Sequence, residues 1–181
     1  MIRMVPGLLF MFLCGVLLLV LMRMEKPAVT PDNPLVGVAM PSLPLIDAKS
    51  ADAALGAADY KGKVTVINFF ASWCNPCAME MGELVKLHQE NPKVRFIGVA
   101  WNDGPAAIAP WLAKHGDPFG EVRYDDSGRA AMSLGLRGIP ETFIVDAHGI
   151  VRCIVPGTVT PDMRTQKLTP LLKQLEAADA S

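Results

Sequence analysis

Two cysteines separated by two residues, Cys74 and Cys77, lie where a strand-like segment of the chain gives way to a helix-like one. Residues 64–70 before them are almost continuously apolar and β-favouring, which is typical of a central strand buried on both faces. Residues 78–89 after them carry apolar side chains at helical spacing. Because a helix N-terminus presents unpaired N–H groups and positive partial charge, it favours a thiolate over a thiol. The motif therefore predicts a redox-active cysteine pair at a strand-to-helix junction.

The spacing of the two cysteines suits thiol–disulfide exchange. A thiolate attacks a substrate disulfide, and a second sulfur within reach resolves the mixed disulfide that forms. At a helix N-terminus the pKa of a cysteine falls from about 8.5 to roughly 3.5–7.5. A Cys-x-x-Cys pair can also be half of a zinc site, but Cys153 stands alone and the three histidines are scattered along the sequence. We expect no metal and no other cofactor, and we interpret Cys153 as a buried, inert thiol.

Length and charge restrict the function classes further. The 181 residues are enough for one ordinary domain and an appendage. The formal net charge is -1, from 17 basic and 18 acidic side chains, and the sequence contains no basic block, so a nucleic-acid partner is not expected. The four cysteines, which include Cys14, form no regular framework, and this excludes a disulfide-stapled scaffold.

The appendage is N-terminal. Residues 5–22 contain no charged side chain, and at about 1.5 Å of rise per residue they come close to spanning the hydrocarbon core of a bilayer. A cleaved signal peptide usually has an apolar region of only about 7–15 residues followed by a small-residue site, whereas charged residues follow this run directly. We therefore expect a single transmembrane anchor at 1–22, a Pro-rich linker at 23–36 and one domain at 37–181.

The order of elements in that domain can be predicted from its apolar pattern. A strand at 64–70, a helix at 78–89 and a second buried strand at 94–100 indicate a right-handed crossover and a parallel pair. The segment before them, 37–46, is interpreted as a short edge strand or hairpin. The later elements are expected to be a helix at 106–114, a short strand at 121–124, a short helix at 129–134, strands at 142–145 and 150–155, and a last helix that begins at Thr169 and Pro170.

Several motifs now identify a family resemblance. The runs are W-C-N-P-C at 73–77, W-N-D at 101–103 and G-I-P-E-T-F at 138–143, together with Glu80. With them the chain resembles the thioredoxin superfamily and, more narrowly, the DsbE/CcmG family of membrane-anchored thiol:disulfide interchange proteins of cytochrome c biogenesis. The resemblance covers residues 37–178. It implies a thioredoxin-like α/β fold of three layers, with a mixed central sheet and an inserted α-β segment.

The resemblance also implies roles for particular residues. Cys74 is expected to be the exposed nucleophile and Cys77 the buried resolving thiol, and the two are expected to form a redox-active disulfide. A cis peptide bond is implied between Ile139 and Pro140 beside the sulfurs, where an extended substrate peptide can pair with the backbone. Three residues around this site are expected to dock the substrate: Trp73, Ile139 and Thr142.

Two carboxylates, Glu80 and Glu141, match acidic residues of the family and are candidate catalytic groups. Glu80 lies three positions after Cys77, on the same side of the expected helix. A partly buried carboxylate at this position has a raised pKa and can take or give a proton. Alternatively, Glu80 is simply a carboxylate near a helix N-terminus, favoured by about 0.3–1 kcal/mol. The residues alone leave both interpretations open, and the resemblance favours proton transfer.

The resemblance therefore implies disulfide reduction on apocytochrome c or a partner thiol protein, with a membrane-embedded disulfide reductase as electron donor. The charges that flank the apolar run do not decide its orientation. We expect a single-pass protein of the bacterial inner membrane facing the periplasm, because this activity is useful where disulfides form.

Other functions remain open at this point. They are a general disulfide reductase or oxidase of the same compartment, a peroxidase of the same fold, and a non-catalytic apocytochrome-binding module. A peroxidase of this fold would have a Thr three residues before its reactive cysteine, where this chain has Ala71. A binding module would not need Cys77 to resolve a mixed disulfide.

Overall fold

The computed structural model describes residues 12–16, 33–47, 54–56 and 58–179. Most of the expected anchor and linker therefore lies outside the described residues. Residues 12–16 are helical. Within the described part of the chain, no helix is long and apolar enough to cross a membrane.

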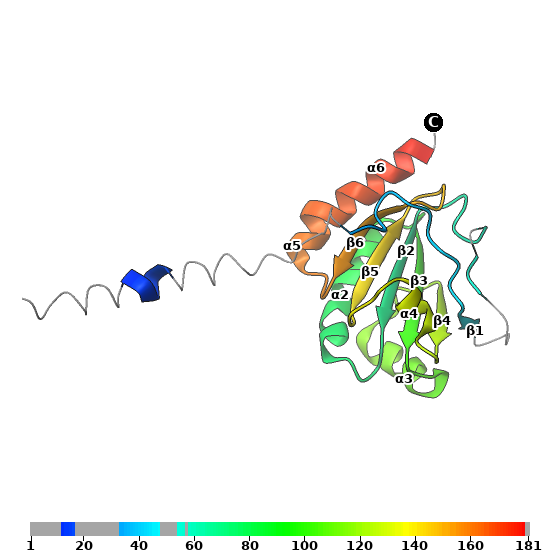
Figure 1. Ribbon diagram of the computed structural model, residues 1–181, viewed down its shortest axis with the longest axis horizontal. Coiled ribbons are helices and arrows are strands. Elements are labelled where there is room, and N and C mark those ends of the chain that lie inside the picture. The colour runs from blue at the N-terminus through cyan, green and yellow to red at the C-terminus, as the bar shows by residue number, and fades with distance from the viewer. Residues whose placement is uncertain (1–11, 17–32, 48–53, 57, 180–181) are drawn as a thin grey trace, which may run out of the picture.

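A mixed six-stranded sheet forms the middle layer of the domain (Figure 1). In spatial order its strands are β1 (Ile46–Asp47), β4 (Glu121–Asp125), β3 (Arg95–Trp101), β2 (Thr65–Phe70), β5 (Glu141–Val145) and β6 (Val151–Pro156). The three central strands β4, β3 and β2 are parallel, whereas β1, β5 and β6 each run antiparallel to their neighbour. The expected crossover from β2 to β3 and the expected hairpin of β5 and β6 are both confirmed.

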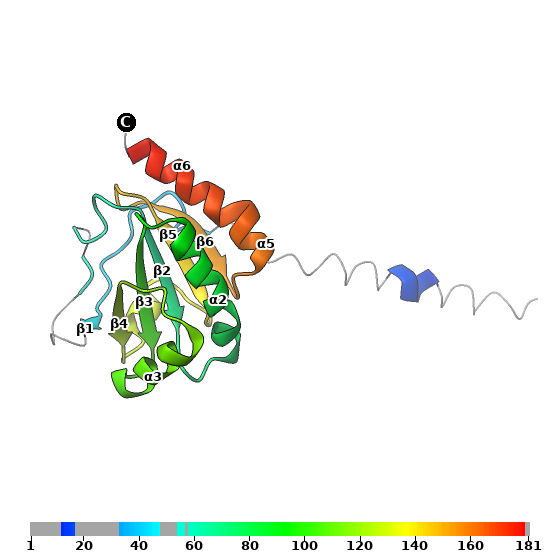
Figure 2. The ribbon, with the colours of Figure 1, turned by 180° about the vertical axis from the view of Figure 1, so that it is seen from behind.

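Helices cover both faces of the sheet, as Figures 1 and 2 show from opposite sides. One face carries α2 (Asn75–Glu90), α3 (Pro105–His115) and a C-terminal unit made of α5 (Pro161–Met163), the π-helical turn η1 (Arg164–Leu168) and α6 (Thr169–Asp179). The other face carries α4 (Arg129–Ser133) and the segment that leads into the domain. The three-layer α/β architecture is therefore confirmed.

Strand β2 separates the two hydrophobic cores. All six of its residues are buried, as the continuous apolar run predicts. Val66 and Phe70 pack with α2, α3 and α6, whereas Ile67 and Phe69 pack with α4. This alternation follows from the period of two in a strand. Leu35, expected at the end of the linker, packs against the second core.

The start of the last helix differs from the prediction. The helical unit begins at Pro161, and Thr160 caps it by accepting a hydrogen bond from the N–H of Met163 at 3.2 Å. The predicted cap, Thr169, lies within the unit, where its N–H donates to the carbonyl of Arg164, five residues earlier. Both Thr-Pro pairs suit a helix start. The second pair is accommodated inside the helix, directly after a π-helical turn.

Candidate active site

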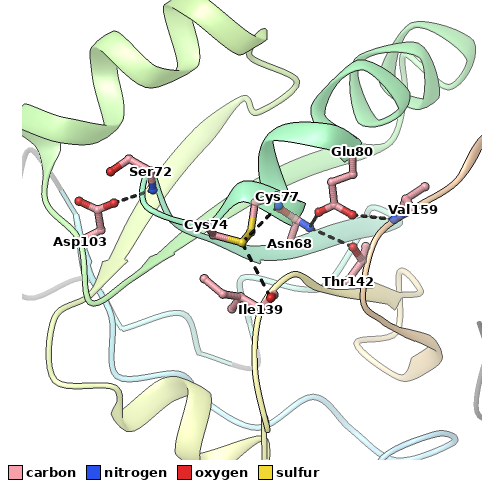
Figure 3. Close-up of a disulfide and its surroundings, with 9 residues drawn as sticks. All are labelled: Asn68, Ser72, Cys74, Cys77, Glu80, Asp103, Ile139, Thr142 and Val159. Atoms are coloured by element: carbon pink, nitrogen blue, oxygen red, sulfur yellow. Dashed lines mark hydrogen bonds between the residues drawn. A yellow bond between two sulfur atoms is a disulfide. The ribbon is translucent and has the colours of Figure 1, made fainter.

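Cys74 and Cys77 form a disulfide at the N-terminus of α2 (Figure 3). Cys74 is the N-cap residue, and its sulfur accepts a hydrogen bond from the N–H of Cys77 at 3.2 Å. Pro76 occupies the first turn, where its missing N–H leaves no helical bond unmade. The strand-to-helix junction thus places the first sulfur over the positive end of the helix dipole.

The exposure of the sulfurs follows the predicted order, but Cys74 is less accessible than expected. Cys77 is fully buried, and Cys74 is 5% exposed. The Cys74 sulfur is bonded to Cys77 and lies 3.8 Å from the carbonyl oxygen of Ile139. Ile139 therefore covers one side of the sulfur in the oxidised protein.

The peptide bond between Ile139 and Pro140 is cis, as the G-I-P-E-T-F run implies. The carbonyl of Pro140 accepts a hydrogen bond from the N–H of Gly157 at 2.8 Å, which ties the start of β5 to the end of β6. The contact between Ile139 and Cys74 brings this segment beside the disulfide (Figure 3). The two motifs that carry the resemblance therefore meet in space.

Glu80 is fully buried in the second turn of α2. One carboxylate oxygen accepts from the side-chain amide of Asn68 at 2.9 Å, and the other accepts from the N–H of Val159 at 2.7 Å (Figure 3). Burial raises the pKa of Glu80 to about 7, although the hydrogen bonds from Val159 and Asn68 act in the opposite direction. Glu80 is therefore not a solvated first-turn carboxylate but a buried group able to exchange a proton near neutral pH.

Glu141 lies on the other face of the sheet. Its neighbour Thr142 faces α2, where its hydroxyl accepts from Asn68, and alternate strand residues point to opposite faces. Glu141 is half-buried and lines a pocket with Leu134 and Arg137. Burial raises its pKa to about 7. The structure therefore separates Glu141 from Glu80, although both carboxyls titrate in the same range.

The three expected docking residues differ in accessibility. Trp73 is 57% exposed, and its indole N–H donates to the carbonyl of Asn102 at 3.3 Å. Ile139 is partly buried beside Cys74. Thr142 is fully buried, so its side chain does not face a substrate in this structure. Its expected docking role is corrected, because the hydroxyl belongs to the hydrogen-bond network of Glu80.

One residue of the site escapes the sequence analysis, and a second appears there only as part of the W-N-D motif, without a role. Asn68 interrupts the apolar run of β2, and a polar residue in a buried strand requires partners, which is the signal that was available. Asp103 accepts hydrogen bonds from the N–H groups of Ser72 at 2.7 Å and Gly104 at 2.8 Å. It therefore ties the loop before the cysteines to the loop after β3 (Figure 3).

Comparisons with known proteins agree with this geometry. Residues 36–154 match the AhpC/TSA family. The chain is 34% identical over 152 residues to the thiol:disulfide interchange protein HelX of Rhodobacter capsulatus, covering 83% of this chain and 84% of that protein. It is 33% identical over 144 residues to the thiol:disulfide interchange protein DsbE of Allochromatium vinosum, covering 80% and 79%. The chain belongs to the AhpC/TSA family and, within it, to the DsbE-type thiol:disulfide interchange proteins.

Solved structures support the fold of this DsbE-type protein. A thiol:disulfide interchange protein of Chlorobium tepidum superposes with a TM-score of 0.60 at 24% identity, covering 77% of this chain and 96% of that one. A secreted disulfide oxidoreductase of Mycobacterium tuberculosis superposes with a TM-score of 0.56 at 21% identity, covering 75% and 94%. The family membership and the Cys74–Cys77 disulfide make this DsbE-type protein a thiol:disulfide oxidoreductase.

Proposed function

We propose that this oxidoreductase reduces disulfide bonds in apocytochrome c, or in a partner thiol protein, during cytochrome c maturation. The observation that carries the proposal is the joint position of three groups at one helix N-terminus. These groups are the sulfur that attacks, the sulfur that resolves and the buried carboxyl of Glu80 one turn later. The cytochrome substrate itself is inferred from the family resemblance.

The first chemical step belongs to Cys74. In the reduced protein its thiolate attacks one sulfur of a substrate disulfide, forming a mixed disulfide and releasing the other substrate sulfur as a thiolate. The N–H of Cys77 and the unpaired N–H groups of α2 stabilise the Cys74 thiolate before attack. Cys74 therefore supplies the nucleophile.

The second step belongs to Cys77 and Glu80. The Cys77 thiol gives its proton to the Glu80 carboxylate, and the resulting thiolate attacks the Cys74 sulfur. The Cys74–Cys77 disulfide forms, the second substrate sulfur leaves as a thiolate, and that thiolate takes up a proton. Two electrons have then moved from the protein to the substrate. A carboxyl with a pKa of about 7 suits this proton transfer at neutral pH.

Substrate contacts are assigned to the surface around the sulfurs. Trp73 offers an exposed ring, and Ile139 offers its backbone beside Cys74, next to the cis bond to Pro140. Glu141 takes no part in the sulfur chemistry of this proposal, because it lies on the opposite face of the sheet.

The cellular setting is part of the same proposal. A charge-free run at residues 5–22 supports a single-pass anchor at residues 1–22 in the bacterial inner membrane. The domain then faces the periplasm, where a reductant of disulfides has substrates. A membrane-embedded disulfide reductase returns the protein to its dithiol form.

A trapping experiment with the full-length chain tests the proposal. Reduced Cys77→Ala, offered an apocytochrome c with an oxidised Cys-x-x-Cys site, is expected to accumulate a mixed disulfide through Cys74. Cys74→Ala is expected to trap nothing, and Cys153→Ala is the control that turns over normally. Equal binding of substrate by all three variants, without covalent capture, would indicate a binding module instead.

A redox equilibrium separates a reductase from an oxidase. The wild-type protein is equilibrated in glutathione buffers and the free thiols are scored by alkylation. A strongly reducing couple supports the proposal, and a strongly oxidising couple indicates a disulfide donor. Consumption of hydrogen peroxide by the reduced protein at a catalytic rate would favour the peroxidase alternative.

A further inference from the structure

Only the nitrogen of the Asn68 side-chain amide forms hydrogen bonds with the described residues. Its nitrogen donates to Glu80 at 2.9 Å and to the hydroxyl of Thr142 at 3.0 Å (Figure 3). Its oxygen is buried and has no hydrogen-bond partner among the described residues. Buried polar atoms are normally paired, so this acceptor requires an explanation.

The network as it stands suits the ionised form of Glu80, in which both carboxylate oxygens act only as acceptors. One carboxylate oxygen accepts from Asn68, and the other accepts from the backbone N–H of Val159. A protonated Glu80 also needs an acceptor for its O–H, and neither the Asn68 nitrogen nor the N–H of Val159 can accept. The N–H of Val159 is part of the backbone and cannot reverse, whereas the amide of Asn68 can turn about its last side-chain bond.

We propose that Asn68 is a positioning residue whose amide turns over when Glu80 takes up a proton. In the turned state the Asn68 oxygen accepts hydrogen bonds from the protonated Glu80 and from the hydroxyl of Thr142. A hydroxyl serves equally as acceptor or donor, so Thr142 follows either orientation. The two halves of an amide have nearly the same size, so the turn needs little space in a packed core.

This inference rests on the proposed proton transfer between Cys77 and Glu80 and deepens it. In either orientation Asn68 offers Glu80 the group that its proton state needs, a donor when Glu80 is ionised and an acceptor when it is protonated. The other half of the amide then faces the place where the Asn68 oxygen now has no partner among the described residues. A buried carboxyl without such a device loses a hydrogen bond each time its proton state changes. Asn68 and Thr142 therefore let Glu80 exchange a proton without opening the core.

Three groups on the same face of the sheet do not change protonation near pH 7, where Glu80 titrates. Burial raises the pKa of Cys153, on the same face of the sheet, to about 11. Hydrogen bonds from Lys86 and from Arg164 of η1 hold the pKa of Glu83 below its ordinary value. In the oxidised protein the sulfur of Cys77 is bonded and does not titrate. The oxidised chain therefore separates the titration of Glu80 from that of Cys77.

Nuclear magnetic resonance on the oxidised, full-length chain tests the inference directly. The chain is labelled with 15N at asparagine and 13C at glutamate, and the glutamate signal of Glu80 is assigned with Glu80→Gln. The Asn68 amide signals are expected to shift with the same midpoint as the Glu80 carboxyl carbon. Cross-peaks from the amide protons of Asn68 to Thr142 are expected above that midpoint and to be lost below it.

Asn91 is a matched control in the same spectrum. It is a second buried asparagine, its nitrogen donates to the carbonyl of Leu87 at 2.8 Å, and its oxygen likewise has no partner among the described residues. Because the hydrogen bond donated by the Asn91 side chain goes to a backbone carbonyl and not to a carboxyl group, its amide signals are expected to stay constant as pH changes. If the Asn68 signals also stay constant while Glu80 titrates, the inference is overturned.

Variants give a second, functional readout in the resolution of the mixed disulfide. Asn68→Leu removes the donor to ionised Glu80, so the pH of half-maximal rate is expected to rise by about one unit or more. Asn91→Leu, which loses a buried hydrogen bond elsewhere, is expected to leave that pH unchanged. If Asn68→Leu leaves the pH of half-maximal rate unchanged, the inference is contradicted. The resonance titration uses the wild-type chain and therefore tests the inference even if this variant does not fold.

The two proposals fail separately. If Asn68 follows Glu80 but Glu80→Gln resolves mixed disulfides at the wild-type rate, the amide turn is supported and the proton transfer is not. If Glu80→Gln abolishes the pH dependence but Asn68 ignores the titration of Glu80, the amide turn is overturned and the proton transfer stands.

Discussion

The backbone N–H of Cys77 donates a hydrogen bond to the sulfur of Cys74 at 3.2 Å, so the nucleophile also caps the helix that carries its partner. Oxygen side chains usually fill the N-cap position. A sulfur at this position accepts hydrogen bonds from backbone N–H groups, and these hydrogen bonds become stronger when the sulfur is a thiolate. Reduction of the disulfide therefore creates a thiolate at a position already prepared for it.

The buried carboxyl of Glu80 makes stability depend on pH. Its pKa rises from 4.5 to about 7 on folding, so between these values the folded protein binds more protons than the unfolded chain. The contribution of Glu80 to the free energy of unfolding is therefore lost as pH rises through this window, by about 3 kcal/mol in total.

Glu80→Gln has no titrating carboxyl at this position, so its comparison with wild type isolates the contribution of Glu80 to the free energy of unfolding. The variant is expected to gain stability relative to wild type as pH rises from 5 to 8, because the other titrating groups cancel in the comparison. Urea unfolding of both proteins at several pH values measures the difference. A difference that does not change with pH would show that Glu80 keeps an ordinary pKa in the folded protein.

Two glycines are expected to respond in opposite ways to the same substitution. In Gly98→Ala the new methyl group would lie 2.8 Å from both Phe70 and Phe119, whose rings stack at 5.0 Å. We expect a loss of about 1–3 kcal/mol from overpacking. In Gly82→Ala the methyl group meets no atom within 4 Å, and helix propensity predicts a gain of about 0.5–1 kcal/mol. Thermal unfolding of both variants tests this contrast.

The C-terminal helical unit gives a further comparison. Thr160→Ala removes the cap at its start and is expected to cost about 1 kcal/mol. Thr169→Ala removes an exposed hydrogen bond to Glu90 and is expected to cost roughly 0.5 kcal/mol or less. Chemical denaturation measures both values, and a larger loss for Thr169→Ala would favour a helix that starts at Thr169.

Asp103 is expected to order the loop before the cysteines. Asp103→Ala leaves the N–H of Ser72 without its acceptor, so faster hydrogen exchange is expected at this amide. Because Trp73 follows directly, the KM for protein substrates is expected to rise. Asp103→Asn keeps an acceptor oxygen and is expected to restore part of the loss. Unchanged exchange at Ser72 in Asp103→Ala would contradict this role.

Much of this fold can be predicted from the sequence because its signals are local. The continuous apolar run gives β2, and the helical spacing after Cys77 gives α2. The resemblance adds the cis bond before Pro140. The hydrogen-bond partners of a buried polar group are harder to predict, because they come from distant parts of the chain. Glu80 meets Val159 across 79 positions.

The remaining errors also have physical causes. Neighbouring strand residues face opposite sides, so Glu141 and Thr142 cannot both approach the sulfurs, and the motif alone does not say which one does. The second Thr-Pro pair resembles a helix start, but a π-helical turn before Thr169 makes room for it inside a helix.

The alkylation of Cys74 across a range of pH tests the proposed chemistry most directly. The fully reduced chain is treated with iodoacetamide, and modification at each cysteine is followed by mass spectrometry. Cys74 is expected to react with a midpoint within roughly pH 3.5–7.5, while Cys77 and Cys153 react far more slowly. A midpoint for Cys74 near the ordinary value of about 8.5 would contradict activation by the N-terminus of α2.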